Sequence, residues 1–311
     1  MTDVAAVADL AARVVASMER VVVGKRTELA LLVTAVLGRG HVLVEDVPGT
    51  GKTLVARSLA ASLGLEFGRI QCTPDLLPND ITGVNVYDRA TASFEFRPGP
   101  VFAGVVLADE INRATPRTQA ALLEAMLEEQ VTVDGVSHPM PDPFVVLATQ
   151  NPIEFEGTFP LPEAQVDRFM LTSRLGYLTT EEERHLVRSG LRSASMIDAV
   201  TDSNELRRAM DVVASVHVDE AVAGYVVEIA QRTRNHDSVL LGASTRASLA
   251  LTSAARAAAA VEGRDYVLPD DVKRLASPVL AHRLVLDPDA RLRRLTSEDL
   301  VRSIVGSVGI D

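Results

Sequence analysis

A short loop between an apolar segment and a helical pattern carries the residues best suited to bind phosphate. It reads Pro48-Gly49-Thr50-Gly51-Lys52-Thr53, after the apolar run 41–45 and at the start of a helical pattern over 52–63. Glycines let successive backbone N–H groups curl around phosphate oxygens, and the amino end of a helix adds positive potential. In such a loop Lys52 contacts the β- and γ-phosphates, and the Thr53 hydroxyl binds Mg²⁺. The sequence therefore predicts an ATP and Mg²⁺ site over Pro48–Leu54, against the alternative of a glycine-rich turn that only caps a helix.

Two further apolar runs end in polar side chains that suit hydrolysis. The run 105–108 ends in Asp109 and Glu110, and the run 144–149 leads to Asn151. Ligands of parallel sheets bind at the carboxyl ends of the strands, so these side chains should meet the phosphate loop. Asp109 fits a Mg²⁺-holding role, largely through water, and Glu110 fits the base that orients the attacking water. Asn151 is placed to hydrogen-bond the γ-phosphate or that water. Solvated acids at an exposed strand end, and a simple Asn-Pro turn, are the alternatives.

The elements that must position these residues alternate between strand and helix as far as about Tyr177. Strands are expected over 41–45, 66–71, 104–109 and 144–149, and helices over 3–20, 28–37, 52–63 and 115–129. Thr27 is expected to cap the second of these helices. Residues 73–100 are an irregular insertion in which Val84–Tyr87 and Ser93–Phe96 can pair, and Asp134-Gly135 predicts a second hairpin within 130–140. This alternation indicates a parallel α/β sheet.

Beyond residue 177 the strand signals fade and amphipathic helices dominate. They are expected over 180–192, 203–215, 218–233, 245–262 and 269–279. The sequence thus predicts an α/β nucleotide-binding core over residues 1–178 and a smaller all-helical domain over residues 179–311.

Composition narrows the class of protein. Of the 311 residues 47% are hydrophobic, yet no apolar run approaches the length that spans a bilayer, and the first residues lack the pattern of a signal peptide. Cys72 is the only cysteine, so an internal disulfide is excluded and a cytoplasmic location is expected. The formal net charge of −11 disfavours nucleic acid as a partner, and no Lys or Arg occurs between Arg117 and Arg168.

In their order along the chain, these motifs resemble the MoxR family of AAA+ ATPases, in the helix-2-insert clade. The most specific stretches are Glu45–Gly49, Asp109–Ala114 and Leu161–Phe169, and the resemblance covers most of the chain. Asp46 stands where the phosphate loop usually begins with glycine, and the family commonly has this aspartate. The resemblance implies an AAA+ P-loop core with a five-stranded parallel sheet and a C-terminal helical lid.

The resemblance also assigns roles to further residues. Val23 and Gly24 would border the adenine, and Asn151 would be the first sensor. Arg246 would be the second sensor, in a segment where Ser244 or Thr245 can cap the helix. The insertion and the second hairpin would face the central pore of a ring.

Arg168 would be the arginine finger that acts on the ATP of a neighbouring subunit. A trans arginine implies assembly, so a homo-oligomer, most simply a hexameric ring, is expected. The alternatives are a salt bridge of Arg168 with Asp167 or Glu163 and a solvated position for Arg246. Two further roles, those of Arg113 and Gln71, stay open.

The expected output is that of a chaperone-like protein that remodels or activates partner complexes, in which a partner with a von Willebrand factor A domain is common. Two alternatives stay open. One is a nucleotide-gated scaffold or switch, in which ATP binding alone controls partner binding. The other is the ATPase subunit of a machine similar to a metal chelatase, which the scattered histidines and single cysteine support little.

Overall fold

Five parallel strands form the central sheet of the computed structural model, which describes residues 3–152, 157–190 and 192–309. Their bounds are β1 Val42–Glu45, β2 Phe67–Gln71, β5 Val105–Asp109, β8 Val145–Gln150 and β9 Leu171–Ser173. They lie in the order β2-β5-β8-β1-β9, and every neighbouring pair is parallel. The expected five-stranded sheet is thus confirmed. β9 is not predicted from the sequence, because three residues are too few to show a periodic pattern.

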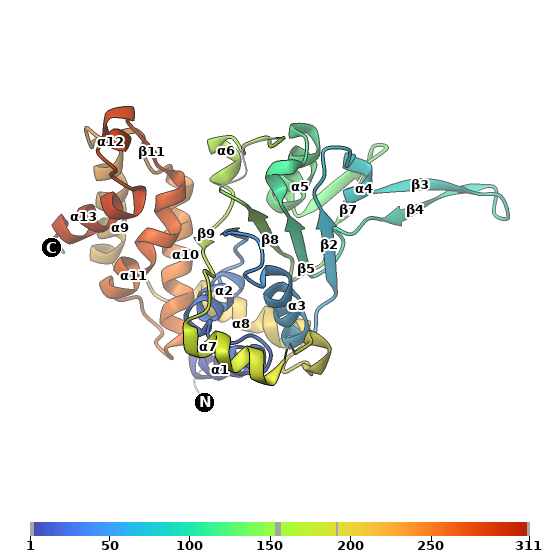
Figure 1. Cartoon of the computed structure of the whole chain (residues 1–311), viewed down its shortest axis with the longest axis horizontal. Helices are drawn as coiled ribbons and strands as arrows, with labels where there is room; N and C mark the ends of the chain where they lie inside the picture. Colours follow the sequence, from blue (N-terminus) through green and yellow to red (C-terminus); the bar gives the residue numbers. More distant parts are fainter. Residues whose placement is uncertain (1–2, 153–156, 191, 310–311) are drawn as a thin grey trace.

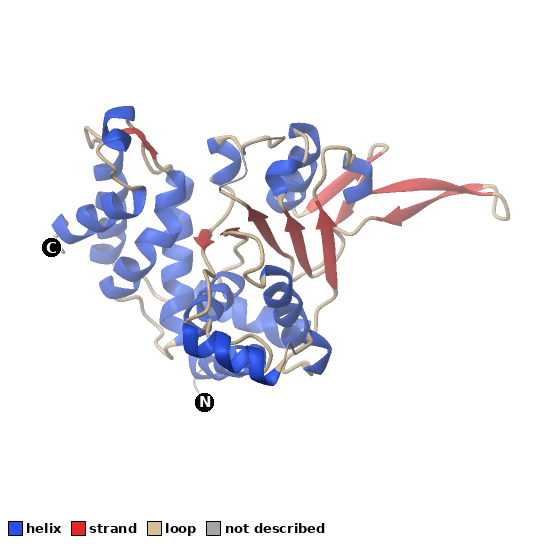
Figure 2. Cartoon of the chain, in the orientation of Figure 1, coloured by secondary structure: helices blue, strands red, loops and turns tan. Residues whose placement is uncertain are grey.

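Helices cover both faces of this sheet (Figures 1 and 2). Their bounds are α1 Asp3–Glu19, α2 Arg26–Leu37, α3 Lys52–Leu63 and α5 Pro116–Glu128. Successive side chains of a strand point to opposite faces, so the core divides into two clusters. Val44 and Leu107 pack with α1, α2 and α3, whereas Leu43 and Val106 pack with α5. The central strands are apolar because both of their faces are buried.

The predicted insertion folds into a short helix and a long hairpin, which we call the arm (residues 83–98). The elements are α4 Pro78–Thr82, β3 Gly83–Asp88 and β4 Ser93–Pro98, and the arm projects from the sheet side of the molecule (Figure 1). The second hairpin is also confirmed, with β6 Gln130–Val133 and β7 Val136–Pro139. Asp134 and Gly135 both have positive φ, at 49° and 82°, as a tight hairpin turn requires. Asn85 donates a hydrogen bond of 2.7 Å to Asp134, so the two hairpins support each other.

The C-terminal part of the chain is a helical lid with one small sheet. Its elements are α9 Glu220–Arg234, β10 Val239–Leu241, α10 Thr245–Val261, α11 Pro269–Leu280, β11 Val285–Leu286, α12 Pro288–Leu292 and α13 Ser297–Ser307. The expected helical lid is confirmed, and it contains in addition one short antiparallel pair, β10 with β11, that the sequence does not predict. The pair was missed because its strands have only three and two residues.

In the described ranges, three further α-helices lie between β8 and the lid along the chain, α6 before β9 and α7 and α8 after it. They are α6 Glu163–Val166, α7 Thr180–Ser189 and α8 Ser203–Ser215, and single 3-10 turns occur at Ile111–Arg113, Ala194–Met196 and Ala281–Arg283. α8 contacts α1, α2 and α10, and therefore touches both the core and the lid. The division of the chain at residue 178 stays a prediction.

Two helix ends differ from the sequence-based expectation. α2 begins at Arg26, and Lys25 rather than Thr27 occupies the cap position, because Gly24 with a φ of 70° turns the chain earlier than expected. α7 ends at Ser189 instead of continuing to 192, because Gly190 adopts a φ of 74°. Position 191 lies outside the described residues. Among the helices of the described ranges, none combines the length and the apolar character that a membrane crossing requires.

Candidate active site

The phosphate loop connects β1 to α3, as predicted, and its glycines hold a backbone shape that other residues rarely adopt. Gly49 and Gly51 have φ values of 86° and 90°, and Gly51 is the cap residue of α3. A Cβ added at either glycine would meet no atom within 4 Å. The backbone conformation, rather than lack of space, therefore requires glycine here. The same open space leaves the loop N–H groups accessible to a phosphate.

Lys52 lies along the phosphate loop. Its ammonium donates to the carbonyl oxygens of Asp46 and Val47, at 3.1 and 2.8 Å. The Thr50 hydroxyl also donates to the Val47 oxygen, at 3.3 Å. Lys52 and Thr53 open the first turn of α3, so both residues lie at the amino end of this helix, where an anion is favoured.

Asp46 fastens the loop to the rest of the sheet, which explains an aspartate where a glycine is usual. Its side chain accepts hydrogen bonds from the backbone N–H groups of Val47 (2.9 Å) and Gly176 (2.7 Å). Its own N–H donates to the Gln150 oxygen at 3.2 Å, beyond the last paired residue of β1. The residue is only 7% exposed. The carboxylate thus joins the phosphate loop to the segment that follows β9.

Replacing Asp46 by alanine should weaken ATP binding. Two backbone N–H groups would lose their acceptor, and an unsatisfied buried donor costs about 1–3 kcal/mol. If half of one such cost is transmitted to the loop, the dissociation constant of ATP rises by about two- to tenfold. Titration with a fluorescent ATP analogue measures the dissociation constant. Asp46→Asn keeps one acceptor oxygen, so its dissociation constant should lie between those of wild type and Asp46→Ala. Wild-type affinity in Asp46→Ala would show that the loop does not need this anchor.

Asp109 and Glu110 are held by a threonine on the neighbouring strand. The Thr149 hydroxyl donates to Asp109 Oδ1 at 2.8 Å and accepts from the Glu110 N–H at 2.8 Å. Thr149 is fully buried at the end of β8, the strand between β5 and β1. Sequence reasoning missed this role, although a hydroxyl residue in an otherwise apolar strand was the available signal. The link fixes both acids relative to the strand that leads to Asn151.

Two arginines complete the arrangement of the acids. Arg69 lies 2.8 Å from Asp109 Oδ2 and also donates to Gln71, while Arg113 lies 3.1 Å from Glu110 Oε2. Glu110 itself has a φ of 59°, a strained value for a residue with a side chain. Strain of this kind occurs at functional sites. Arg113 and Gln71, whose roles the sequence leaves open, are therefore partners of the acidic strand end.

The only cysteine lies beside these acids but is a poor nucleophile. The backbone N–H of Cys72 donates to the Asp109 oxygen at 2.9 Å. Burial, together with the charges of Asp109 and Glu110, raises the pKa of the Cys72 thiol to about 12. The thiol therefore stays protonated and unreactive near neutral pH.

A cavity of about 260 Å³ adjoins the phosphate loop. It is lined by residues on three segments: Val21, Val22, Val23 and Lys25; Gly49, Thr50, Gly51, Leu54 and Val55; and Gly176, Tyr177, Leu178, Glu183 and Leu186. Lys25 crosses between two of these segments, since its ammonium donates to the Tyr177 oxygen at 2.9 Å. Val23 and Leu54 thus line the cavity beside the phosphate loop, whereas Gly24 does not.

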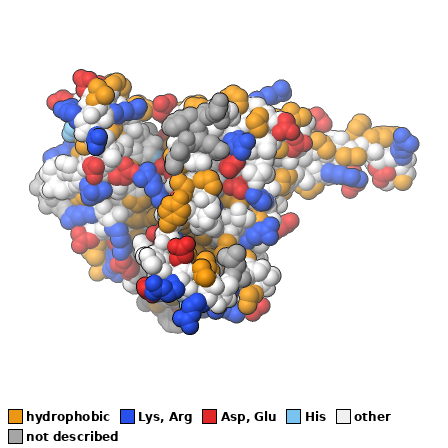
Figure 3. Space-filling model, in the orientation of Figure 1, with side chains coloured by type: hydrophobic (Ala, Val, Ile, Leu, Met, Phe, Trp, Pro, Cys, Tyr) orange, Lys and Arg blue, Asp and Glu red, His pale blue; other side chains and the backbone are white. Residues whose placement is uncertain are grey.

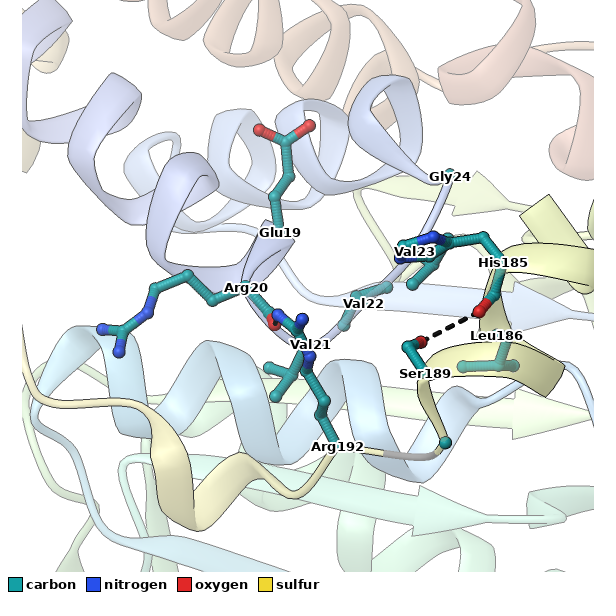
Figure 4. Close-up of a pocket in the computed structure, with 11 residues that line it drawn as sticks. Glu19, Arg20, Val21, Val22, Val23, Gly24, His185, Leu186, Ser189 and Arg192 are labelled. Atoms are coloured by element: carbon teal, nitrogen blue, oxygen red, sulfur yellow. Dashed lines mark hydrogen bonds between the residues drawn. The ribbon is translucent and has the colours of Figure 1, made fainter. Parts of the chain in front are cut away.

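Gly24 lines an adjoining pocket between residues 19–24 and α7 (Figure 4). In this view Val22 and Val23 lie opposite His185 and Leu186, and Arg192 reaches back to donate to the Arg20 oxygen at 2.8 Å. At Gly24 itself a side chain would collide with the Glu182 carboxylate. Helix α7 therefore packs directly on the segment that borders the nucleotide cavity.

The remaining predicted residues fall into two places. Asn151 follows β8 directly, next to the strand end that bonds to Asp46. Arg168 lies between α6 and β9, and Arg246 lies in the first turn of α10. Within the described ranges, no hydrogen bond or ion pair links either arginine to the phosphate loop, and none pairs the Arg168 side chain with Asp167 or Glu163. Asp167 instead pairs with Arg283 at 2.8 Å, so the salt-bridge alternative for Arg168 is wrong.

Comparison with known proteins agrees with this geometry. Residues 41–171 match the family model described as "ATPase family associated with various cellular activities (AAA)", and residues 231–304 match an AAA lid domain. The uncharacterized protein YeaC of Bacillus subtilis is 48% identical, over 97% of this chain and 95% of its own length. Chaperone MoxR1 of Mycobacterium tuberculosis is 41% identical, over 96% of this chain and 81% of its own length. A crystal structure from Cytophaga hutchinsonii has a TM-score of 0.92 at 38% identity and covers 99% of this chain and 97% of its own.

A P-loop between β1 and α3, acids at the end of β5, and a helical lid therefore occur together in a chain that is similar over nearly its whole length to proteins named MoxR. The chain belongs to the MoxR family of AAA+ ATPases.

Proposed function

We propose that this ATPase hydrolyses ATP with Mg²⁺ at the carboxyl ends of β1, β5 and β8. The observation that carries the proposal is a chain of bonds at the end of β8: Lys52 bonds to Asp46, Asp46 bonds to Gln150, and the neighbouring Thr149 holds Asp109 and Glu110. A threonine hydroxyl and a carboxylate are oxygen donors of the kind that Mg²⁺ prefers, so Thr53 and Asp109 would hold the ion, the latter largely through water. The ion would neutralise charge that builds up on the phosphates.

The chain's own residues would perform the remaining tasks. The loop N–H groups and Lys52 bind the β- and γ-phosphates. Glu110 orients the attacking water and accepts its proton, and Asn151 holds that water or the γ-phosphate in line. Val23 and Leu54 enclose the base, while Gly24 gives the close turn on which α7 packs.

Lys52→Ala should lower ATP turnover by about 10²–10³-fold, the usual effect of removing one charged donor from a transition state. The chain offers a matched control in Lys273, an exposed lysine of the lid that pairs with Asp270. Turnover measured by phosphate release should be normal in Lys273→Ala. Undiminished turnover in Lys52→Ala would exclude this loop as the hydrolysis site.

The site is proposed to be completed by another subunit. Arg168 has no hydrogen-bonding or charged partner for its side chain among the described residues, and it lies on a connection at the edge of the sheet rather than at the phosphate loop. An arginine in this position suits action on the ATP of a neighbouring subunit in a ring. The proposed size of the ring is a hexamer. Arg246 would sense the nucleotide from the lid.

The proposed output is remodelling or activation of a partner protein complex, in line with the chaperone name of the relative from Mycobacterium tuberculosis. The arm provides a surface for this. Near its tip Tyr87 and Phe94 are 52% and 71% exposed and pack edge to face on each other. Figure 3 shows apolar side chains along the arm, mixed with charges of both signs. That mixture suits a protein client better than nucleic acid.

A partner with a von Willebrand factor A domain and a cytoplasmic location remain predictions.

Removing both aromatic rings of the arm should separate client handling from hydrolysis. In Tyr87→Ser with Phe94→Ser, we expect basal ATP turnover within about twofold of wild type, because surface changes of this kind cost little stability. Stimulation of turnover by an unfolded protein such as casein should be lost. Val227→Ser, at an exposed position of the lid helix α9, is the control. Equal stimulation of the double variant and wild type would rule out the arm as the client surface.

A further inference from the structure

The carboxylate of Asp167, the residue directly before Arg168, is held by three lid side chains. The Ser244 hydroxyl donates to it at 2.9 and 3.1 Å, and Arg283 donates through Nε at 2.8 Å. Arg246 forms a longer ion pair with it at 3.7 Å. Ser244 caps α10 and Arg283 ends the 3-10 turn after α11, so the contacts come from two separate parts of the lid.

Arg283 holds the backbone on both sides of Arg168 as well. Its guanidinium donates to the carbonyl oxygens of Asp167 (3.2 Å), Phe169 (2.7 Å) and Met170 (3.1 Å). The side chain is only 2% exposed. A guanidinium has its donors in a rigid fork, so its orientation fixes the three carbonyl groups together. The chain that carries Arg168 is therefore shaped by a buried lid residue.

Asp167 supplies the charge that this arrangement requires. It is the acidic partner of Arg283 within the described part of the chain. A buried cation that loses its partner is strongly destabilising, whereas the pair itself adds little stability and serves mainly to fix a geometry. The Arg168 side chain itself has no such contact in the described ranges. The position of Arg168 therefore depends on the contacts of Asp167, the residue before it.

We propose that Asp167 is a positioning residue through which the lid of one subunit sets how that subunit presents Arg168 to its neighbour. Arg246 shares the same carboxylate, so a displacement of the lid would alter the contacts of Asp167 and with them the direction of Arg168. The inference rests on the proposed role of Arg168 in a shared site. It adds that hydrolysis in one subunit depends on the lid of the next.

Mixed assemblies test this. Receiving subunits carry Arg168→Ala and keep an intact phosphate loop, whereas giving subunits carry Lys52→Ala and keep Arg168. Either population alone should be inactive. In the mixture, ATP turnover should come from receiving subunits that lie beside a giving subunit and obtain its Arg168. Ser244→Gly is then placed in one population at a time. Glycine is tolerated at the cap position of a helix, so the change mainly removes the hydroxyl bound to Asp167.

Ser244→Gly in the giving subunits should lower the turnover of the mixture by about tenfold at unchanged KM, since a misplacement of about 1 Å can cost about 100-fold. The same change in the receiving subunits should cost less than about twofold. Ser244→Thr, which keeps the hydroxyl, should restore the rate. Asp167→Asn in the giving subunits should reproduce the loss, and Thr296→Gly, at the equivalent cap of α13, should not.

Equal losses from either population, or no loss from the giving side, would overturn the proposal. A mixture of giving and receiving subunits that lack Ser244→Gly distinguishes a failure of this proposal from a failure of the proposed function. If that mixture stays inactive, Arg168 does not act in trans, and the inference falls together with the shared site. If it is active and Ser244→Gly has no effect, the shared site stands and only the role of Asp167 is refuted.

Discussion

Arg168→Ala should lower ATP turnover by about 10³–10⁵-fold, the range for an arginine that stabilises phosphoryl transfer. This corresponds to about 4–7 kcal/mol of transition-state stabilisation. ATP binding should be nearly unchanged, because the phosphate loop and the nucleotide cavity belong to the subunit that binds the ATP. Phosphate release and titration with a labelled ATP analogue measure the two quantities separately.

The control for this variant is Arg302→Ala. Arg302 is 71% exposed on the lid and pairs with Asp299 of the same helix, so its loss should leave turnover unchanged. A fall in both turnover and ATP affinity of Arg168→Ala would mean that the arginine supports its own subunit's site. Wild-type turnover would exclude it from the reaction.

Glu110→Gln should lower hydrolysis by about 10²–10⁴-fold, the usual contribution of a positioned general base. Glutamine keeps the shape of the side chain and can still pair with Arg113, so the strained backbone at this residue is preserved. ATP should therefore stay bound, and the assembly should be arrested with its client attached. Glu124→Gln, on the exposed side of α5, is the matched control.

The same variant separates the two outputs that the sequence leaves open. A remodelling ATPase arrested by Glu110→Gln should retain its client in the presence of ATP and lose its biological output. A switch that needs only ATP binding should keep that output. Hydrolysis at the wild-type rate in Glu110→Gln would instead remove this glutamate from the mechanism.

Local signals allowed the nucleotide-binding elements to be predicted closely. The helix after the phosphate loop spans Lys52–Leu63 as expected, because a glycine in the left-handed conformation precedes it and another follows it. The cap of α5 by Thr115, the turn at Asp134-Gly135 and the arm also follow from short-range patterns. Each of these features is decided by residues close together in the chain.

Contacts between distant residues could not be predicted in this way. The bond from Gly176 to Asp46 and the bond from Thr149 to Asp109 depend on the strand order, which brings separate segments to one edge. The pairing of Asp167 with Arg283 joins residues 116 positions apart, and no short pattern marks a buried arginine. For this reason the sequence indicates Asp167 only as a partner of its neighbour Arg168.

The most direct test of the account is ATP turnover per subunit measured against protein concentration, with the mass of the assembly recorded in the same samples. If Arg168 completes the site of a neighbouring subunit, turnover per subunit should rise in step with the assembled fraction. Isolated subunits should then be slower by at least about 10³-fold. Isolated subunits that hydrolyse ATP at the full rate of the assembly would contradict a shared active site.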